Sequence, residues 1–273
     1  MNTSGHQFGD PDAGRSVARY LGLTMQEVGE VREGAATVLG HAPAPAYLRS
    51  ADGTIAMGAL LGVADSVAGL CGGLAALPGW VVSTNLMLRA IHLDVVGPLA
   101  LRADVLRAGR NAVITSVSIR DAGADDRLVA DGALTSAILV PEGGPPVYDR
   151  PLHLDAPTLD PTATPRLADF LGIRAVADDA LAIDVTDELR NPWGIVHGAV
   201  TAALVDLAAR HTTGGRATTD TVLHFLAPGR VGPVVATVTP VGTRADGALV
   251  RVEVRDRGAA DRLMAVAVAT VAP

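Results

Sequence analysis

The chain has 273 residues, of which 49% are hydrophobic and only 3% are aromatic. This length and apolar content fit a globular protein of one or two domains and exclude a disordered chain. The formal net charge of -7 argues against nucleic acid as the main partner. The one cysteine, Cys71, excludes an internal disulfide and suits a reducing cytoplasm.

The beginning of the chain is predicted to be a tail that leads into a domain with a buried helix. Residues 1–15 are polar and lack the apolar segment of a signal peptide, so we expect a flexible tail. Residues 58–77 are apolar enough to test as a membrane helix, but they contain Asp65 and five glycines. A helix buried in a protein core is therefore the better interpretation, and no membrane partner is expected.

A proline-rich segment divides the chain into two parts. Residues 141–165 hold seven of the 17 prolines, which is typical of an extended linker. We therefore predict a first domain at 16–140 and a second domain at 166–273.

The two predicted domains repeat each other and are called the first and second copy below. Matching landmarks lie 150, then 141, then 135 residues apart, which indicates small insertions in the first copy. The pairs are Tyr20-Leu21-Gly22-Leu23 with Phe170-Leu171-Gly172-Ile173, Asp65 with Asp206, Gly97-Pro98 with Gly232-Pro233, Arg120-Asp121 with Arg255-Asp256, and Leu128 to Thr135 with Leu263 to Thr270.

Each copy has the same predicted elements: a short strand, a buried helix and four further strands. The strands are expected near 36–39, 81–88, 99–106, 112–119 and 128–139, and again near 181–185, 219–226, 234–241, 249–254 and 263–271. Consecutive strands joined by short turns form antiparallel sheets. The predicted fold class is α+β, with an antiparallel sheet wrapped around a central helix in each copy.

The helix of the second copy begins with the most unusual stretch of the sequence. Asn191 and Pro192 predict a turn, and the small apolar residues from His197 to Arg210 predict a buried helix. His197 and Gly198 stand at its N-terminus, where free N–H groups and the helix dipole favour negative charge.

Asp206 lies inside this apolar helix, where burying a carboxylate is costly. It follows His197 by nine residues, which is roughly half a revolution and about 13 Å along a helix. The two side chains therefore point to opposite sides and cannot easily serve one site on their own helix. If both are catalytic, each needs a partner from the other copy.

The wrapped helix and the pattern Asn191…Gly194…His197-Gly198…Asp206 resemble the hotdog-fold acyl-CoA thioesterases of the phenylacetate-pathway and THEM type. The resemblance covers both copies and implies a tandem double hotdog. It also implies that each active site lies between two hotdog units. One unit supplies the Asn, His and Gly, and the other supplies an acidic residue and a nearby Ser or Thr.

Carried over to this sequence, one composite site joins Asn191, His197 and Gly198 of the second copy to Asp65 and Ser83 of the first. Thioester hydrolysis passes through an oxyanion, which the Gly198 N–H would stabilise. Asp65 would act either as a general base on water or as a nucleophile that forms a mixed anhydride, and burial should raise its pKa. His197 and Asn191 would position the carbonyl, and Ser83 would orient the water or Asp65.

The second composite site would use Asp206 and Thr218 of the second copy. Its other side departs from the pattern, because Ser50, Ala56 and Met57 stand where the Asn, His and Gly should be. We therefore predict one intact site and one degraded site.

The resemblance implies a cytoplasmic acyl-CoA thioesterase that needs no metal and no cofactor beyond the coenzyme A of its substrate. Assembly of such chains into a homo-oligomer remains open. Two alternatives are a hotdog hydratase or dehydratase acting on enoyl or hydroxyacyl thioesters, and a non-catalytic acyl-CoA-binding protein. The segment from His224 to Gly229 faintly resembles the His-Phe-Pro turn of hotdog dehydratases, but the acidic partner motif of that family is missing.

Overall fold

The computed structural model describes residues 17–140, 151–191, 193–214 and 217–273. The predicted tail, the start of the predicted linker, and Pro192 lie outside these residues.

The first copy contains the helices α1 (Val17–Tyr20), η1 (Ala46–Leu48, a 3-10 turn) and α2 (Met57–Ala75), and the strands β1 (Thr24–Glu27), β2 (Thr37–Ala42), β3 (Trp80–Ala90), β4 (Leu99–Ala108), β5 (Ala112–Asp121) and β6 (Arg127–Leu139).

The rest of the chain repeats this order of elements after one short strand, β7 (His153–Leu154), which pairs with β1. The second copy contains α3 (Leu167–Phe170), η2 (Asp187–Leu189, a 3-10 turn) and α4 (Gly198–Thr212), and the strands β8 (Arg174–Ala177), β9 (Ala180–Ile183), β10 (Thr218–Phe225), β11 (Val234–Arg244), β12 (Gly247–Asp256) and β13 (Arg262–Val271).

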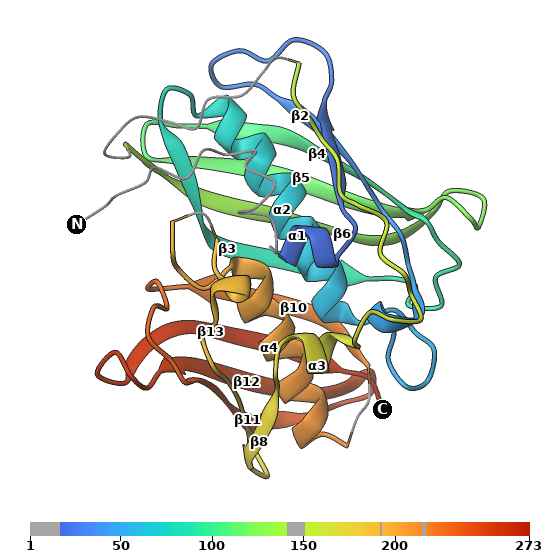
Figure 1. Cartoon of the computed structure of the whole chain (residues 1–273), viewed down its shortest axis with the longest axis vertical. Helices are drawn as coiled ribbons and strands as arrows, with labels where there is room; N and C mark the ends of the chain where they lie inside the picture. The colour runs from blue at the N-terminus through green and yellow to red at the C-terminus, as the bar shows by residue number, and fades with distance from the viewer. Residues whose placement is uncertain (1–16, 141–150, 192, 215–216) are drawn as a thin grey trace.

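The strands of the described residues form one antiparallel sheet in the order β7-β1-β2-β4-β5-β6-β3-β10-β13-β12-β11-β9-β8. The order β2-β4-β5-β6-β3 of the first copy recurs as β9-β11-β12-β13-β10 in the second, read from the opposite edge. Figure 1 shows that each copy folds its part of the sheet around one long helix. The predicted α+β class, with an antiparallel sheet around a central helix, is confirmed.

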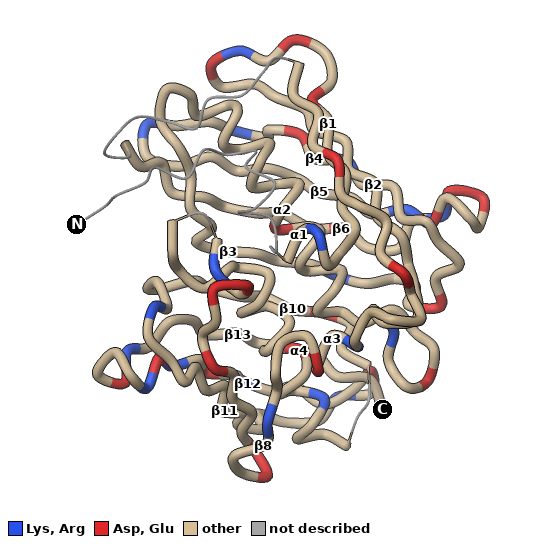
Figure 2. The backbone as a smooth tube through the Cα atoms, viewed as in Figure 1, with Lys and Arg blue, Asp and Glu red and all other residues tan. Residues whose placement is uncertain are grey.

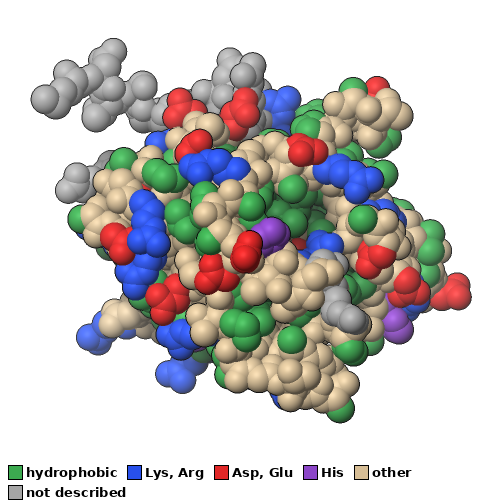
Figure 3. Space-filling view, turned by 90° about the horizontal axis from the view of Figure 1, so that it is seen from below, with side chains coloured by type: hydrophobic (Ala, Val, Ile, Leu, Met, Phe, Trp, Pro, Cys, Tyr) green, Lys and Arg blue, Asp and Glu red, His purple; other side chains and the backbone are tan. Residues whose placement is uncertain are grey.

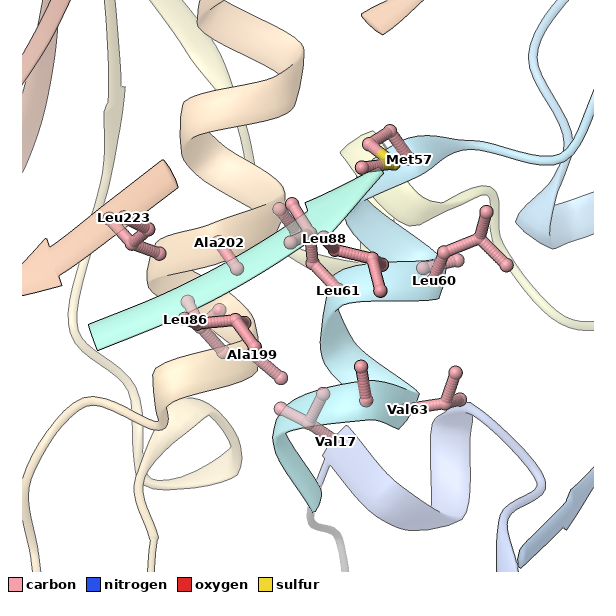
Figure 4. Packing of buried hydrophobic residues seen from close by; sticks show 14 of the residues in the cluster. Val17, Met57, Leu60, Leu61, Val63, Leu86, Leu88, Ala199, Ala202 and Leu223 are labelled. Atoms are coloured by element: carbon pink, nitrogen blue, oxygen red, sulfur yellow. The ribbon is translucent and has the colours of Figure 1, made fainter. Parts of the chain in front are cut away.

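The two copies meet where β3 pairs with β10. Met87 lies opposite Val222 at the centre of this pairing, and Asn85 lies opposite His224. Because Met87 and Val222 are also equivalent positions of the repeat, 135 residues apart, a pseudo-twofold axis passes between them. Leu86 and Leu88 of β3 and Leu223 of β10 pack in the core near α2 and α4 (Figure 4).

The central helices α2 and α4 pack directly against each other through small residues. A Cβ atom added at Gly58 would lie 2.8 Å from the Cα atom of Ala203, and one added at Gly62 would lie 3.2 Å from the Cβ atom of Ala199. The helix α2 is long and apolar enough to cross a membrane, but 89% of its most apolar stretch is buried in the fold. Its hydrophobicity is therefore explained by its place in the core.

Charged residues lie mostly in turns and at strand ends, and both signs are interspersed on the surface (Figures 2 and 3). Two buried carboxylates are exceptions with a structural role. Asp121 accepts hydrogen bonds from the N–H groups of Val96 and Gly97. At the repeat-equivalent position, Asp256 accepts them from Arg230, Val231 and Gly232. These carboxylates hold the turn that precedes β4 or β11 in each copy.

Candidate active site

Asp65 lies in the middle of α2, with 7% of its surface exposed. Its Oδ1 atom accepts a hydrogen bond of 2.7 Å from the hydroxyl of Ser83. The Ser83 side chain comes from β3, next to an irregularity in the pairing between β3 and β6 at Ser83 and Asn85. The strand and the helix of the first copy thus bring together the two residues that the sequence assigned to one site.

The second copy places the start of α4 against this carboxylate. A Cβ atom added at Gly198 would lie only 2.5 Å from Asp65 Oδ2, so this approach requires glycine. The Gly198 N–H, in the first turn of the helix, donates to no partner within the described part of the chain. A donor that is not used by the helix therefore lies beside a buried carboxylate, although the two come from different copies.

His197 precedes Gly198 and caps α4 with its own side chain. Its Nδ1 atom accepts a hydrogen bond of 3.1 Å from the Ala199 N–H. Burial lowers the pKa of His197, although the charge of Asp65 opposes this effect. In the neutral ring, Nδ1 is then the acceptor and Nε2 carries the proton, so His197 presents a single N–H donor.

Asn191 organises the loop that leads to this helix. Its Oδ1 atom accepts hydrogen bonds from the N–H groups of Trp193 at 3.0 Å and Ile195 at 3.3 Å. The oxygen of Asn191 is therefore engaged in shaping the loop, which fits a residue that positions others. The loop is also anchored to the rest of the second copy, because the Val196 N–H donates to the carbonyl of Gly229 at 2.9 Å.

The electrostatics favour a proton-accepting carboxylate. Burial raises the pKa of Asp65, while His197 and the hydrogen bond from Ser83 act in the opposite direction. A carboxylate with a raised pKa is a stronger base than one in water. Asp65, Ser83, His197 and Gly198 thus combine a basic carboxylate, a hydroxyl and two N–H donors at the junction of the two copies.

The repeat-equivalent carboxylate, Asp206 on α4, has a different environment. It is fully buried, and its Oδ2 atom accepts a hydrogen bond of 2.8 Å from the Gly58 N–H at the start of α2. Burial raises its pKa. The Thr218 hydroxyl is close to Asp206, but neither it nor Asp206 Oδ1 has a hydrogen-bond partner within the described residues.

The two locations differ because α2 lacks a side chain that can cap it. Ala56 occupies the capping position and forms no side-chain hydrogen bond. The N–H of Gly58, equivalent to that of Ala199, is then available for Asp206. Met57, equivalent to Gly198, is buried and puts a side chain where the location beside Asp65 has none. The carboxylate of Asp206 is therefore sealed against the helix end.

Cys71 and the remaining histidines do not join either location. The Cys71 thiol is buried, donates to the carbonyl of Ala36 at 3.3 Å, and has a pKa raised by burial to about 12, which leaves it unreactive. His224 contacts Asn85 across the junction at 3.0 Å. In the described part of the chain, no three His, Cys, Asp or Glu side chains gather as metal ligands would.

Two features of this region escaped the sequence reasoning. The chain has only two tryptophans, Trp80 and Trp193, and they stack on each other with ring centroids 5.9 Å apart. The other feature is the hydrogen bond between Asn85 and His224. The second contact depends on the register between β3 and β10, and the first depends on how the loop before α4 lies against β3. Both join residues more than a hundred positions apart. The one signal in the sequence that could have drawn attention to the tryptophans was that the chain has so few aromatic residues.

Comparison with solved structures shows the fold. A candidate thioesterase from Novosphingobium aromaticivorans superposes with a TM-score of 0.59 at 19% identity, covering 86% of this chain and 94% of that one. A protein with a hot dog fold and unknown function from Alicyclobacillus acidocaldarius gives 0.58 at 13% identity, with 90% and 94% covered. The tesB protein of Mycobacterium avium subspecies paratuberculosis gives 0.57 at 15% identity, with 86% and 92% covered.

Sequence comparison adds the family. Residues 186–272 match the family described as the acyl-CoA thioesterase N-terminal domain. This match covers about a third of the chain, so it is the second copy that is similar to this family. No curated protein shows significant sequence similarity to it.

The matched region contains only part of the candidate site. Asn191, His197 and Gly198 lie within residues 186–272, whereas Asp65 and Ser83 lie outside them. The carboxylate and hydroxyl are therefore assigned to the site by their position in the fold and not by the family match.

Proposed function

We propose that this chain hydrolyses an acyl-CoA to the free acid and coenzyme A at one composite site between its two copies. The observation that carries the proposal is the junction of Asp65 and Ser83 with the unused N–H of Gly198. The family match supports a thioester substrate. Nothing in the proposed reaction requires a cofactor other than the coenzyme A that is part of the substrate.

The proposed reaction uses each group for one task. The Gly198 N–H and the Nε2–H of His197 would act as the donors that hold the thioester oxygen and stabilise the oxyanion that forms on it. Asp65 would remove a proton from a water that attacks the carbonyl, or attack the carbonyl itself to give a mixed anhydride that water then opens. In either route the tetrahedral intermediate collapses with cleavage of the C–S bond, and coenzyme A leaves as the thiolate and is protonated. Ser83 would keep the Asp65 carboxylate in a fixed orientation.

The second location is proposed to be inactive. Asp206 is held by the Gly58 N–H, and Ala56 offers no donor to a carbonyl. One site per chain would follow from this difference. A cytoplasmic location and assembly into homo-oligomers remain predictions from the sequence.

The test is thiol release from short-chain, long-chain and aryl acyl-CoAs by the wild type, Asp65→Asn and Asp206→Asn. We expect turnover to fall roughly 10²–10⁴-fold in Asp65→Asn, the range for a lost acid–base group, and to stay near the wild-type value in Asp206→Asn. Loss in Asp206→Asn alone would show that the copies are paired wrongly. Loss of enoyl-thioester absorbance without thiol release would favour a hydratase. Tight binding of an acyl-CoA without turnover would favour a non-catalytic binding protein.

A further inference from the structure

One position on α2, close to Asp65, leaves space that the rest of this helix does not. Every residue of α2 is buried in the fold except Ser66 and Gly69. Gly69 follows Asp65 by four positions, so the two residues are neighbours on the helix surface. Beyond its own helix and within the described residues, a Cβ atom added at Gly69 would meet a single atom, Leu134 Cδ2 at 3.9 Å. An apolar space therefore lies one helical turn beyond the candidate carboxylate.

This space ends one further turn along α2. Gly73 follows Gly69 by four positions and is buried, and a Cβ atom added there would lie 2.7 Å from the Trp80 ring. Trp80 is 6% exposed and begins β3, the strand that also carries Ser83. At 1.5 Å per residue, Gly73 lies about 12 Å beyond Asp65 along the helix axis. The space beside Gly69 is thus bounded by the carboxylate at one end and by an indole ring at the other.

The second copy has a large charged residue at the equivalent position. Arg210 of α4 lies 141 positions after Gly69, one helical turn beyond Asp206. Burial raises the pKa of Asp206, and the charge of Arg210 opposes this effect. Hydrogen bonds from Thr54 lower the pKa of Asp52, and the same arginine contributes to the lowering. Arg210 therefore lies near both carboxylates at the location that we propose to be inactive. The duplicated fold does not require glycine at this position, which associates Gly69 with the candidate site.

We propose that the space beside Gly69 binds an unbranched aliphatic acyl group of the substrate, and that Gly69 and Trp80 determine the length of this group. The inference rests on the proposed function and names its substrate class. Two chains lead away from a thioester carbonyl held at Asp65, the acyl chain and the pantetheine arm of coenzyme A. A space that is closed at its far end suits the acyl chain, which ends there, whereas the pantetheine arm must continue to the nucleotide.

The position of the Trp80 ring limits the length of the chain. Of the 12 Å or so between Asp65 and Gly73, a non-bonded contact with the ring takes up roughly 3.5 Å. About 8 Å then remains, which is roughly six bonds, because three bonds of an extended chain span about 3.8 Å. We therefore expect acyl groups of about six to eight carbons to fill the space. Each methylene buried there should strengthen binding.

Binding can be measured apart from turnover in the Asp65→Asn variant by titration calorimetry. The probes are free coenzyme A, acetyl-CoA, octanoyl-CoA and dodecanoyl-CoA. We expect octanoyl-CoA to bind at least roughly tenfold more tightly than acetyl-CoA, and dodecanoyl-CoA to bind no more tightly than octanoyl-CoA. Adding Gly69→Leu, which fills the space, should abolish the advantage of octanoyl-CoA and leave free coenzyme A unaffected. Gly69→Ala is the matched control and should keep most of this advantage, because its Cβ atom meets only an ordinary contact.

Several results would overturn the proposal. Equal affinities for acetyl-CoA and octanoyl-CoA in Asp65→Asn would show that the space binds no acyl chain, and this holds even if Gly69→Leu does not fold. A Gly69→Leu substitution that weakens free coenzyme A as much as octanoyl-CoA would show that the space holds the pantetheine arm. Tighter binding of dodecanoyl-CoA than of octanoyl-CoA would refute the limit set by Trp80. If the wild type releases no thiol from any acyl-CoA, the proposed function fails, but the titration still decides whether the acyl chain binds beside Gly69.

Discussion

Replacing Gly198 by Ala tests the geometry of the candidate site most directly. The new Cβ atom would lie 2.5 Å from Asp65 Oδ2, whereas non-bonded atoms normally stay roughly 3.5 Å apart. The carboxylate must then move by about 1 Å, and a displacement of this size in an active site can cost about 100-fold in rate. We therefore expect kcat for thiol release to fall about 100-fold, which corresponds to about 2.7 kcal/mol.

The same substitution should change stability much less than activity. Overpacking costs about 1–3 kcal/mol, and part of this is offset because alanine favours a helix over glycine by about 1 kcal/mol. A fall in Tm of a few degrees is expected by calorimetry. Gly242→Ala is the matched control, since a Cβ atom there would meet nothing within 4 Å. A Gly198→Ala enzyme with kcat within about threefold of the wild type would refute the reasoning.

Three further predictions concern the carboxylates. Ser83→Ala removes a hydrogen bond that lowers the pKa of Asp65, so the acid limb of the kcat profile should move to higher pH. Asp256→Asn weakens the acceptor for four N–H groups and should lower the unfolding free energy by about 1–3 kcal/mol in urea titrations at pH 7. Burial raises the pKa of Asp256, but these bonds hold it below its usual value, so the difference should shrink as the pH falls through the acid range. Burial raises the pKa of Asp206, so the ionised carboxylate destabilises the folded protein at pH 7–8. Asp206→Asn should therefore have a higher Tm than the wild type at pH 7–8 and lose this advantage near pH 4. A Tm difference between the two proteins that stays the same across this range would contradict the prediction.

The sequence could predict the fold because its signals are local and occur twice. His197 and the small residues that follow it indicate where the helix at Gly198 begins. The strands of each copy follow from runs of alternating residues joined by short turns. Short elements such as β1, β7 and β8 have no such pattern, since they are held by pairing with strands far away in the chain. Their existence depends on the assembled sheet and not on their own sequence.

The sequence predicts which residues form the candidate site better than it predicts their protonation and their packing. If His197 and Asp206 are both catalytic, the half-turn between them predicts partners from the other copy, and the structure places Gly198 beside Asp65. The proton on His197 was not predictable, because it follows from the hydrogen bond between Nδ1 and the Ala199 N–H. The proximity of Trp80 and Trp193 was not predictable either. It depends on how the loop before α4 lies against β3, which only the packing of the two copies determines.

The contrast between Asp65 and Asp206 has a common physical cause in how the two central helices are capped. Every helix begins with N–H groups that lack partners within the helix. His197 satisfies one of them in α4 with its own ring, so the Asp65 carboxylate of the first copy is not needed as a cap. Ala56 cannot do this for α2, so Asp206 supplies the acceptor instead. An alanine at the capping position therefore offers no donor to the second location, and the carboxylate there acts as a structural cap. A symmetric pair of identical subunits could not separate these two roles, whereas a duplicated chain can.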